Sequence, residues 1–423
     1  MKKIIASAGV AALGAASLQA AYAPGLSPVE KSKPWTISAS LRGFYDDNYL
    51  TSNKANERDS FGIELSPSLA LNLALDQTLI GFSYQYSLRW YEDRSQNSAD
   101  HTHQAKFKLN HAFNERFKVE VKDDFVVAQE PQVIDPSGAV TTPLRNDGNN
   151  LRNIARVGLS AELTPIIGLD VSYQNSIYDY DQTGSGSRSA LLDRMEHLGN
   201  INGRWQAAQN TAGLFGYMYG AAGYTSDDSL DQLTDFGAPF VDPAIRDSTS
   251  HTVYLGVDQI FTSKLNASLR LGAEFTDYPD ATGGMDDSTT SPYVDGSATW
   301  TYNPGSYLQL GLRVDRNATD IAFQNAATPT QDQLSTSAYA SINHRITPRL
   351  TGSLLGHFQH STFNGGANDG DSDNFFMAGL NLSYQINAFL STEAGYNYDR
   401  LDSDISGRSF TRNRVYIGVR ATY

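Results

Sequence analysis

Apolar and polar residues alternate with a period of two along most of the chain. In residues 61–75 the odd positions carry mainly phenylalanine, isoleucine and leucine, and the even positions carry small or polar residues. The same alternation recurs in residues 82–90, 265–275 and 415–423. Successive side chains of a strand point to opposite faces, whereas a helix would spread the apolar set around its circumference, so the pattern predicts β-strands. Pro67 falls inside one of them, and its missing N–H predicts a local bulge.

The connections between these segments alternate between short and long. Short connections rich in turn-forming residues lie at 76–77, 114–116, 164–166, 208–210, 262–264, 303–305, 347–349 and 387–388. Long polar connections lie at 46–58, 92–100, 129–149, 180–190, 226–248, 279–290, 317–332, 362–373 and 400–409. Short turns on one side and long loops on the other are typical of outer-membrane barrels, with the turns periplasmic and the loops extracellular.

The predicted fold class is therefore all-β: a transmembrane antiparallel up-and-down β-barrel. The turns and the two terminal strands add up to about 18 strands, and roughly 16 to 20 would fit the same pattern. Closure of the sheet leaves no strand edge facing lipid. A barrel of this size leaves an aqueous channel, whereas about eight strands would be filled by side chains. No loop is long enough for a folded plug, although loops 226–248 and 129–149 could fold inward and narrow the channel.

The first residues indicate export. Lys2 and Lys3 precede the apolar stretch 4–18, and small residues follow, which is the layout of a secretory signal peptide. We predict a signal peptide at 1–20, a periplasmic leader at 21–34 and a single barrel domain at 35–423. An uncleaved N-terminal anchor is the alternative, but no stop-transfer pattern follows.

Composition narrows the functional classes. The mean hydropathy is −0.39 and the formal net charge is −14. These values argue against a helical membrane protein and against nucleic acid as a partner, but they suit a barrel whose strands are half wetted. The chain has no cysteine, which excludes disulfides and thiolate metal sites.

Aromatic residues concentrate near the predicted strand ends. Near the short turns lie Trp35, Phe113, Phe117, Phe261, Tyr302, Phe389 and Tyr423, and toward the long loops lie Trp90, Tyr91, Tyr178, Tyr219, Tyr224, Tyr278, Phe358 and Tyr398. Two belts of such rings would match the two membrane interfaces. Ordinary strand propensity of aromatic residues would explain the same distribution.

Charged residues fall in the phase that would face the lumen. The predicted basic pore-lining residues are Arg42, Arg89, Lys106, Lys108, Lys118, Lys122, Arg152, Arg156, Arg204, Arg414 and Arg420. The predicted acidic ones are Asp258, Glu274, Asp295, Asp315, Glu393 and Asp399. A basic wall opposite an acidic wall would create a transverse field that favours small polar solutes and biases permeation toward anions. Neutralisation by cross-strand ion pairs is the equally weighted alternative.

Acidic loops raise the question of a metal. Asp227, Asp228, Asp231 and Asp235 share one predicted loop, and Asp369, Asp371 and Asp373 share another. Alternate aspartates can offer oxygens to Ca²⁺, but the second run lacks the glycine and glutamate spacing of a calcium loop. We interpret both loops as solvated and expect no metal and no cofactor.

The end of the chain carries a resemblance. Tyr416, Gly418, Ala421 and Tyr423 are similar to the C-terminal signal read by the barrel-assembly machinery, with tyrosine in place of the usual terminal phenylalanine. Over its mature length the chain resembles the family named putative β-barrel porin 2. That resemblance implies an outer-membrane location and a pore, and it specifies no solute.

Other functions are weighed against a pore. His111 and His197 fall in the apolar phase, and no Gly-x-Ser-x-Gly motif is present, so we expect no enzymatic activity. A surface-exposed structural or adhesive barrel without an open pore is the serious competitor. Expected partners are outer-membrane lipid and lipopolysaccharide, the barrel-assembly machinery and small polar solutes. A homotrimer would use small outward residues, which lipid packing explains equally well: Ala338, Ala340, Gly352, Gly356 and Ala378.

Overall fold

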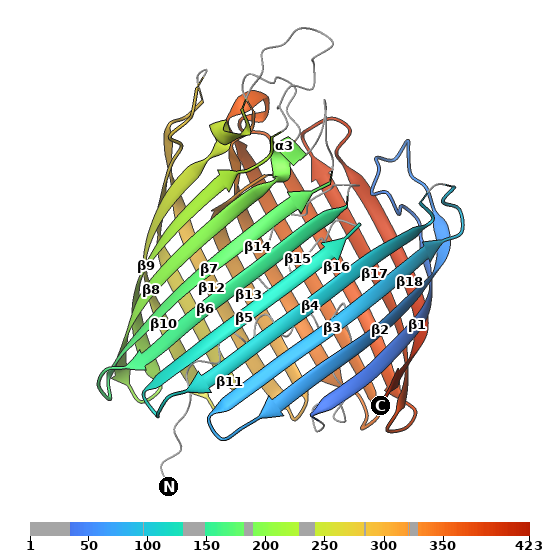
Figure 1. The fold of residues 1–423 in the computed structure, drawn as a ribbon, viewed down its shortest axis with the longest axis horizontal. Coiled ribbons are helices and arrows are strands. Elements are labelled where there is room, and N and C mark those ends of the chain that lie inside the picture. Colours follow the sequence, from blue (N-terminus) through green and yellow to red (C-terminus); the bar gives the residue numbers. More distant parts are fainter. Residues whose placement is uncertain are drawn as a thin grey trace.

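The chain folds into one closed antiparallel barrel. The computed structural model describes residues 34–95, 97–129, 149–181, 189–227, 242–282, 285–319, 321 and 329–423. Each strand pairs with its neighbours in sequence, and the first strand pairs with the last, giving an 18-stranded closed sheet (Figure 1). The predicted fold class and strand number are confirmed. The predicted signal peptide and all but the last residue of the leader lie outside the described residues.

The strands are 12 to 16 residues long. They are β1 (Trp35–Asp46), β2 (Ser60–Ala74), β3 (Thr78–Tyr91), β4 (Ala99–Ala112), β5 (Phe117–Ala128), β6 (Asn150–Glu162), β7 (Ile167–Tyr180), β8 (Arg194–Ala208), β9 (Thr211–Tyr224), β10 (Ser248–Thr262), β11 (Leu265–Asp277), β12 (Ser288–Asn303), β13 (Ser306–Asn317), β14 (Asp332–Arg345), β15 (Leu350–Asn364), β16 (Ser372–Gln385), β17 (Leu390–Ser403) and β18 (Phe410–Thr422). Short helical turns are α3 (Ser189–Leu192), η3 (Pro243–Arg246) and η4 (Gly366–Asn368). None of the helices in the described ranges is long and apolar enough to cross a membrane.

The short turns share one local device. In five of them the side-chain oxygen of the first turn residue accepts the backbone N–H groups two and three residues later. The residues that accept are Asn114, Thr164, Thr262, Thr347 and Asn387. Asn and Thr favour such turns because a short side chain can replace a backbone acceptor. All the predicted short connections lie where the structure has its tight hairpins.

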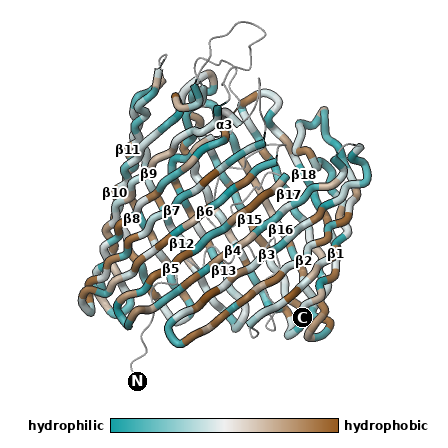
Figure 2. Tube along the Cα trace, viewed as in Figure 1, coloured by the Kyte–Doolittle hydropathy of each residue, from teal (hydrophilic) through white to brown (hydrophobic). Residues whose placement is uncertain are grey.

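The barrel has inverted polarity. Large apolar side chains on alternate strand positions remain exposed on the outside, as with Ile37, Leu255 and Ile417, which are 53%, 65% and 67% exposed. Figure 2 shows the resulting alternation of hydrophobic and hydrophilic positions along the strands. A soluble protein rarely exposes an apolar band this extensive, whereas a barrel in lipid requires one.

The closing seam between β1 and β18 is held by side chains as well as by backbone pairing. Arg412 Nε donates to both carboxylate oxygens of Asp46, at 3.0 and 2.9 Å, and both residues are buried. Arg42 Nη1 lies 2.9 Å from Glu64 Oε1, and Arg42 also pairs with Glu393 on β17. These ion pairs tie β1 to β2, β17 and β18 on the inner face.

The bulge predicted at Pro67 is absent. Leu65 faces Leu88 and Ser68 faces Gln85, so the register between β2 and β3 is the same on both sides of the proline. Pro67 itself stays paired with Ala39 on β1. A missing N–H removes a bond toward one neighbour only, and the rest of both ladders keeps the strand aligned.

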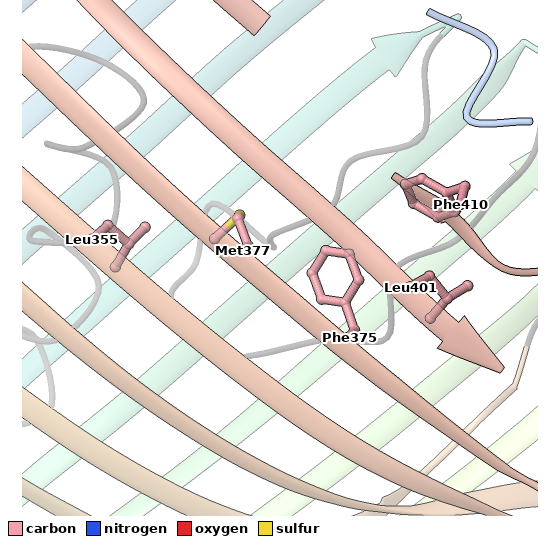
Figure 3. Close-up of a cluster of buried hydrophobic side chains, with 5 residues drawn as sticks. All are labelled: Leu355, Phe375, Met377, Leu401 and Phe410. Atoms are coloured by element: carbon pink, nitrogen blue, oxygen red, sulfur yellow. The ribbon is translucent and has the colours of Figure 1, made fainter. Parts of the chain in front are cut away.

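The inner wall is not uniformly polar, although the alternation in the sequence predicted polar residues at the inward strand positions. Leu355, Phe375, Met377, Leu401 and Phe410 form a buried cluster on the inner face of β15–β18, each at most 5% exposed (Figure 3). Their outward neighbours in sequence, such as Leu354 and Phe376, are apolar too. Two adjacent apolar residues in a strand place one on each face, so these runs were the sequence signal of an apolar inner patch.

Half of the predicted outer aromatic belt faces the other way. Trp90, Tyr219 and Phe358 are exposed on the outer face near the long loops. Four tyrosines assigned to the same belt are instead buried: Tyr91, Tyr178, Tyr224 and Tyr278. Each shares the parity of inward residues, which places its ring in the barrel mouth instead of the membrane interface.

Candidate functional site

The predicted basic pore-lining residues all occupy inward positions, and carboxylates on the same strand, a neighbouring strand or the next strand but one pair with several of them. These pairs are Arg42–Glu64 (2.9 Å), Arg89–Glu64 (3.1 Å), Lys106–Asp124 (3.4 Å), Lys108–Glu120 (4.0 Å), Lys122–Glu120 (2.6 Å) and Arg204–Glu162 (3.6 Å). The neutralising alternative therefore holds for much of the basic wall. The transverse field can arise only from the charges that remain.

Four predicted basic residues have no carboxylate partner within the described ranges: Lys118, Arg156, Arg414 and Arg420. Arg156 Nη2 donates to Ser172 Oγ at 3.3 Å. The Nε atoms of Arg414 and Arg420 are buried and have no hydrogen-bond partner there. The uncompensated positive charge thus lies on β5, β6 and β18.

The predicted acidic residues lie on inward positions of β10–β13 and β17. Arg270 sits between Asp258 and Asp295, at 3.7 and 3.4 Å. Asp315 pairs with Arg313 at 2.6 Å. Glu274 accepts only a long bond, 3.5 Å, from the backbone N–H of Arg316. Glu393 pairs with Arg42, and Asp399 is buried on the inner face of β17.

A cavity of about 260 Å³ lies inside the barrel near its extracellular mouth, against β6–β14 and η3. It brings together three predicted pore-lining residues, Arg152, Glu274 and Asp315, with residues that sequence reasoning did not assign to the pore, among them Arg313. The most prominent of the latter are Arg246 and Arg316. The rest of the predicted basic wall lies away from this cavity.

Arginines and tyrosines alternate along one edge of this cavity. Register places Arg152 opposite Tyr178, Tyr178 opposite Arg194, and Arg194 opposite Tyr224. The guanidinium of Arg194 lies 3.9 Å from the centre of the Tyr178 ring, and that of Arg246 lies 4.4 Å from Tyr224. Stacking on a ring holds a guanidinium flat and leaves its N–H edges for in-plane acceptors. We call these residues the Arg–Tyr row.

The described residues just before β10, 242–247, lie in the barrel mouth. Asp242 caps η3 by accepting the backbone N–H of Ala244, and Pro243 occupies the first turn, where its missing N–H costs nothing. Arg246, only 1% exposed, donates from Nη2 to the carbonyl oxygen of Thr319 at 2.9 Å. The contact connects the β9–β10 loop to the β13–β14 loop. It also places the described end of the predicted inward loop 226–248 beside the cavity.

A hydrogen bond to β9 also holds η3 in place. Asp247, which follows it, accepts the backbone N–H of Tyr224 at 2.7 Å. Burial raises the pKa of Asp247 above its ordinary value, and this hydrogen bond opposes the shift. Ile321, which follows Thr319 closely in the β13–β14 loop, is also buried. The second predicted inward loop, 129–149, lies almost wholly outside the described residues.

The three loop aspartates considered as a possible metal site, Asp369, Asp371 and Asp373, do not surround a common point. Asp369 accepts the backbone N–H of Gly365 at 2.9 Å, whereas Asp373 pairs with Arg408 at 2.8 Å. Within the described ranges no group of three or more His, Cys, Asp or Glu side chains could hold a metal ion. Of the other acidic loop, only Asp227 is described.

The C-terminal residues close the barrel. Tyr416 faces inward, where its ring covers Gly395 of β17, and Gly418 lies against Leu41 and Arg42 of β1. Tyr423 is exposed at the outer rim, and its ring centre lies 5.8 Å from that of Trp35. Their role as an assembly signal stays a prediction.

A family model described as Putative beta-barrel porin 2 matches residues 35–423. No curated protein matches the chain.

Similar solved structures are all barrels of low sequence identity. A BenF-like porin from Pseudomonas fluorescens Pf-5 has 13% identity and a TM-score of 0.45, over 92% of this chain and 99% of that one. The outer membrane protein OpdK from Pseudomonas aeruginosa has 11% identity and a TM-score of 0.42, over 92% and 99%. The FrpB iron transporter from Neisseria meningitidis has 9% identity and a TM-score of 0.45, over 93% and 82%. The family match spans every strand of the barrel, so the chain belongs to the putative beta-barrel porin 2 family and is an outer-membrane β-barrel.

Proposed function

We propose that the protein is a passive diffusion channel for small polar or charged solutes. The observation that carries the proposal is the closed sheet of 18 strands, with an apolar outside and a charged inside. A sheet of this size encloses more space than its own inward side chains fill. The ionised groups of the inner wall need water or polar solutes around them, because burying unpaired charge is costly.

The solutes that such a channel favours follow from its uncompensated charges. Lys118 and Arg156, which form no ion pair with a described carboxylate, leave positive charge on one side of the lumen, while the carboxylates of β10–β13 line the other. A transverse field of this kind orders water and small dipoles and disfavours apolar solutes. The Arg–Tyr row adds cationic groups at the extracellular mouth. We propose that the resulting preference is for small anions.

Conductance is the decisive test. The mature chain, purified and refolded in detergent, should insert into planar bilayers and give steady current steps. A barrel that inserts, shown by its strand circular dichroism and heat-modifiable gel mobility, yet gives no current would favour the alternative of a structural or adhesive surface barrel. The enzyme alternative receives no support from the inner wall, where the described side chains form ion pairs and no nucleophile–base pair.

Ion selectivity tests the charge argument separately. The six basic residues of the N-terminal wall are Lys106, Lys108, Lys118, Lys122, Arg152 and Arg156. Replacing all six with glutamate should move the reversal potential in a salt gradient from anion toward cation preference. An unchanged reversal potential would show that this wall does not set selectivity.

Self-association is a further proposal. Register places Ala340, Gly356 and Ala378 side by side on the outer face of β14–β16, with no side-chain atom over Gly356. Such a flat surface suits close packing between copies, and we propose a homotrimer built on it. Cross-linking in native membranes would show trimers that disappear when Gly356 is replaced by tryptophan. Lipopolysaccharide and the barrel-assembly machinery remain the other proposed partners.

A further inference from the structure

The histidines are concentrated on the outer face of the barrel. Of the eight histidines in the chain, only His357 occupies an inward strand position. Five lie on outward positions near the extracellular ends of their strands. Four of them are on β4, β8 and β10, namely His101, His103, His197 and His251, whereas the fifth, His360 on β15, contacts Asn374 instead. At the periplasmic ends of β4 and β14 lie His111 and His344. A placement this biased calls for an explanation beyond strand propensity.

Each of the four histidines on β4, β8 and β10 near the extracellular side is bonded to a tyrosine in the same way. Their Nδ1 atoms lie within hydrogen-bond distance of phenolic oxygens on the preceding strand. The pairs are His101–Tyr86 (2.7 Å), His103–Tyr84 (2.8 Å), His197–Tyr173 (2.7 Å) and His251–Tyr217 (2.7 Å). In each pair the tyrosine lies two residues from direct register, farther from the extracellular end. We call them the four His–Tyr couples.

The direction of this hydrogen bond determines which ring nitrogen of the histidine carries a proton. When the phenol donates to Nδ1, the neutral imidazole carries its proton on Nε2, and a protonated imidazole carries one there as well. None of the four Nε2 atoms has a hydrogen-bond partner within the described part of the chain. In this arrangement, with the phenol as the donor, each couple presents an N–H donor on the outer surface. A hydrogen-bond acceptor outside the protein would favour the neutral and the protonated ring described above, because both carry a proton on Nε2.

The depth of the couples matches the headgroup region of the outer leaflet. Each histidine lies within four residues of the extracellular end of its strand. At roughly 3.3 Å per residue this places it no more than about 13 Å along the strand from the rim. Interfacial side chains with an apolar body and a polar tip favour this depth.

The neighbouring outward positions of the described strands hold no other cationic group. The outward strand positions of β3–β11 carry no lysine and no arginine. They do carry carboxylates, at Asp123, Asp179 and Asp277. The histidines are thus the one side-chain type on this part of the outer face that can offer N–H donors and positive charge to an anionic headgroup.

We propose that the four His–Tyr couples bind the phosphate groups of lipopolysaccharide in the outer leaflet. The couples supply N–H donors along one side of the barrel, from β4 to β10, at the depth where the lipid phosphates lie. The tyrosines orient the rings, and the phosphate oxygens accept from Nε2. The proposal extends the lipid contact of the barrel and is independent of its pore activity.

The test compares two sets of histidine variants in the refolded full-length mature chain. The first set replaces His101, His103, His197 and His251 with phenylalanine, which keeps a ring and removes the donor. The matched control replaces His111 and His344, at the periplasmic end, in the same way. Binding is measured by native mass spectrometry with lipopolysaccharide, with the same lipid after enzymatic removal of its phosphates, and with phosphatidylglycerol.

We expect the four-residue variant to bind intact lipopolysaccharide about tenfold more weakly than the unmodified protein, as loss of several charge-assisted bonds predicts. The periplasmic control should bind normally, and the dephosphorylated lipid should bind all forms equally weakly. Equal losses in both variants, or undiminished binding of dephosphorylated lipid, would overturn the proposal. Stronger binding of phosphatidylglycerol than of lipopolysaccharide would also overturn it. Unchanged single-channel conductance of the four-residue variant would confirm that its barrel is intact.

Discussion

At the scale of single residues, the inner wall is assembled from glycines covered by aromatic rings of the next strand. Phe44 covers Gly62, Tyr254 covers Gly216, Tyr339 covers Gly311 and Tyr416 covers Gly395. A Cβ at any of these glycines would overlap the ring. Covering a strand glycine in this way replaces the packing that its missing side chain cannot supply. It also keeps four large rings flat against the wall and out of the lumen.

Replacing Gly311 with valine should destabilise the barrel, because Tyr339 must leave its place on the wall. Overpacking of this kind costs about 1–3 kcal/mol. The measurement is the temperature at which the heat-modifiable band unfolds in gel electrophoresis. Gly43→Val is the matched control, since no atom lies within 4 Å of its Cβ position. Equal unfolding temperatures for the two variants would contradict this account.

The charges without partners should control ion selectivity more than the paired ones. Replacing Lys118 and Arg156 with glutamine removes two uncompensated positive charges and should lower the anion preference in reversal-potential measurements. The control removes a complete ion pair, Lys106→Gln with Asp124→Asn, and should leave selectivity near its original value. A larger effect from the paired residues would show that pairing does not screen them.

At the scale of elements, η3 and the closing strands decide how the mouth and the seam are held. Arg246 reaches from η3 to Tyr224 of β9 and to Thr319 beyond β13, so one side chain fastens two extracellular loops over the cavity. At the seam, the pair between Asp46 and Arg412 is buried and bidentate. Both contacts join segments that are far apart in sequence.

Arg246→Ala should release η3 from the β13–β14 loop. We expect a larger single-channel conductance and passage of larger neutral polymers, because the loop no longer narrows the mouth. The comparison variant is Arg400→Ala, whose side chain is 55% exposed and bonds only to Asp402. Identical conductance and size limits for both variants would show that η3 does not form the narrow part of the channel.

Asp46→Asn should weaken the seam by removing the carboxylate that holds the buried Arg412 across β1 and β18, even though register also places Asp399 opposite Arg412. Loss of one partner of a buried pair costs about 3–5 kcal/mol. The unfolding temperature on heat-modifiable gels should fall, and the double variant Asp46→Asn with Arg412→Gln should recover part of the loss. If the double variant is no more stable than the single one, the buried charge is not the cause.

At the scale of the whole molecule, closure of the sheet turns a repeated local pattern into a channel. Alternation alone makes each strand two-faced, and pairing of β1 with β18 converts the polar faces into a single enclosed wall. The wall is uneven: uncompensated bases lie on β5, β6 and β18, a buried apolar cluster lies on β15–β18, and the main cavity lies against β6–β14. Solutes crossing such a barrel meet different chemistry on its different sides.

The sequence by itself determined the strands, their number and their hairpins. These depend on short-range physics: a period of two separates lipid-facing from lumen-facing residues, and Asn114 or Thr164 closes a turn with its own side chain. The same parity located the inward charges, including Lys118 and Glu274. Where alternation lapses, as at Phe375–Met377, parity does not show that the inward residue is apolar. Tyr178 has inward parity, and its assignment to the outer belt was wrong because it followed only the position near the strand end.

Only the tertiary structure decided which inward charges are neutralised and what forms the mouth. The charge of Lys106 is compensated because Asp124 lies opposite it on the neighbouring strand. The register of the two strands determines this pairing, and the composition of the chain does not. Arg246 contacts Thr319, which is 73 residues away in the chain. The two residues belong to different loops, and the polar residues of these loops have no periodic pattern that would predict the contact. The physical reason is the distance along the chain over which each feature is determined. The face of a strand residue depends on its neighbours in sequence, whereas ion pairs, loop contacts and the cavity depend on segments that meet only in the folded barrel.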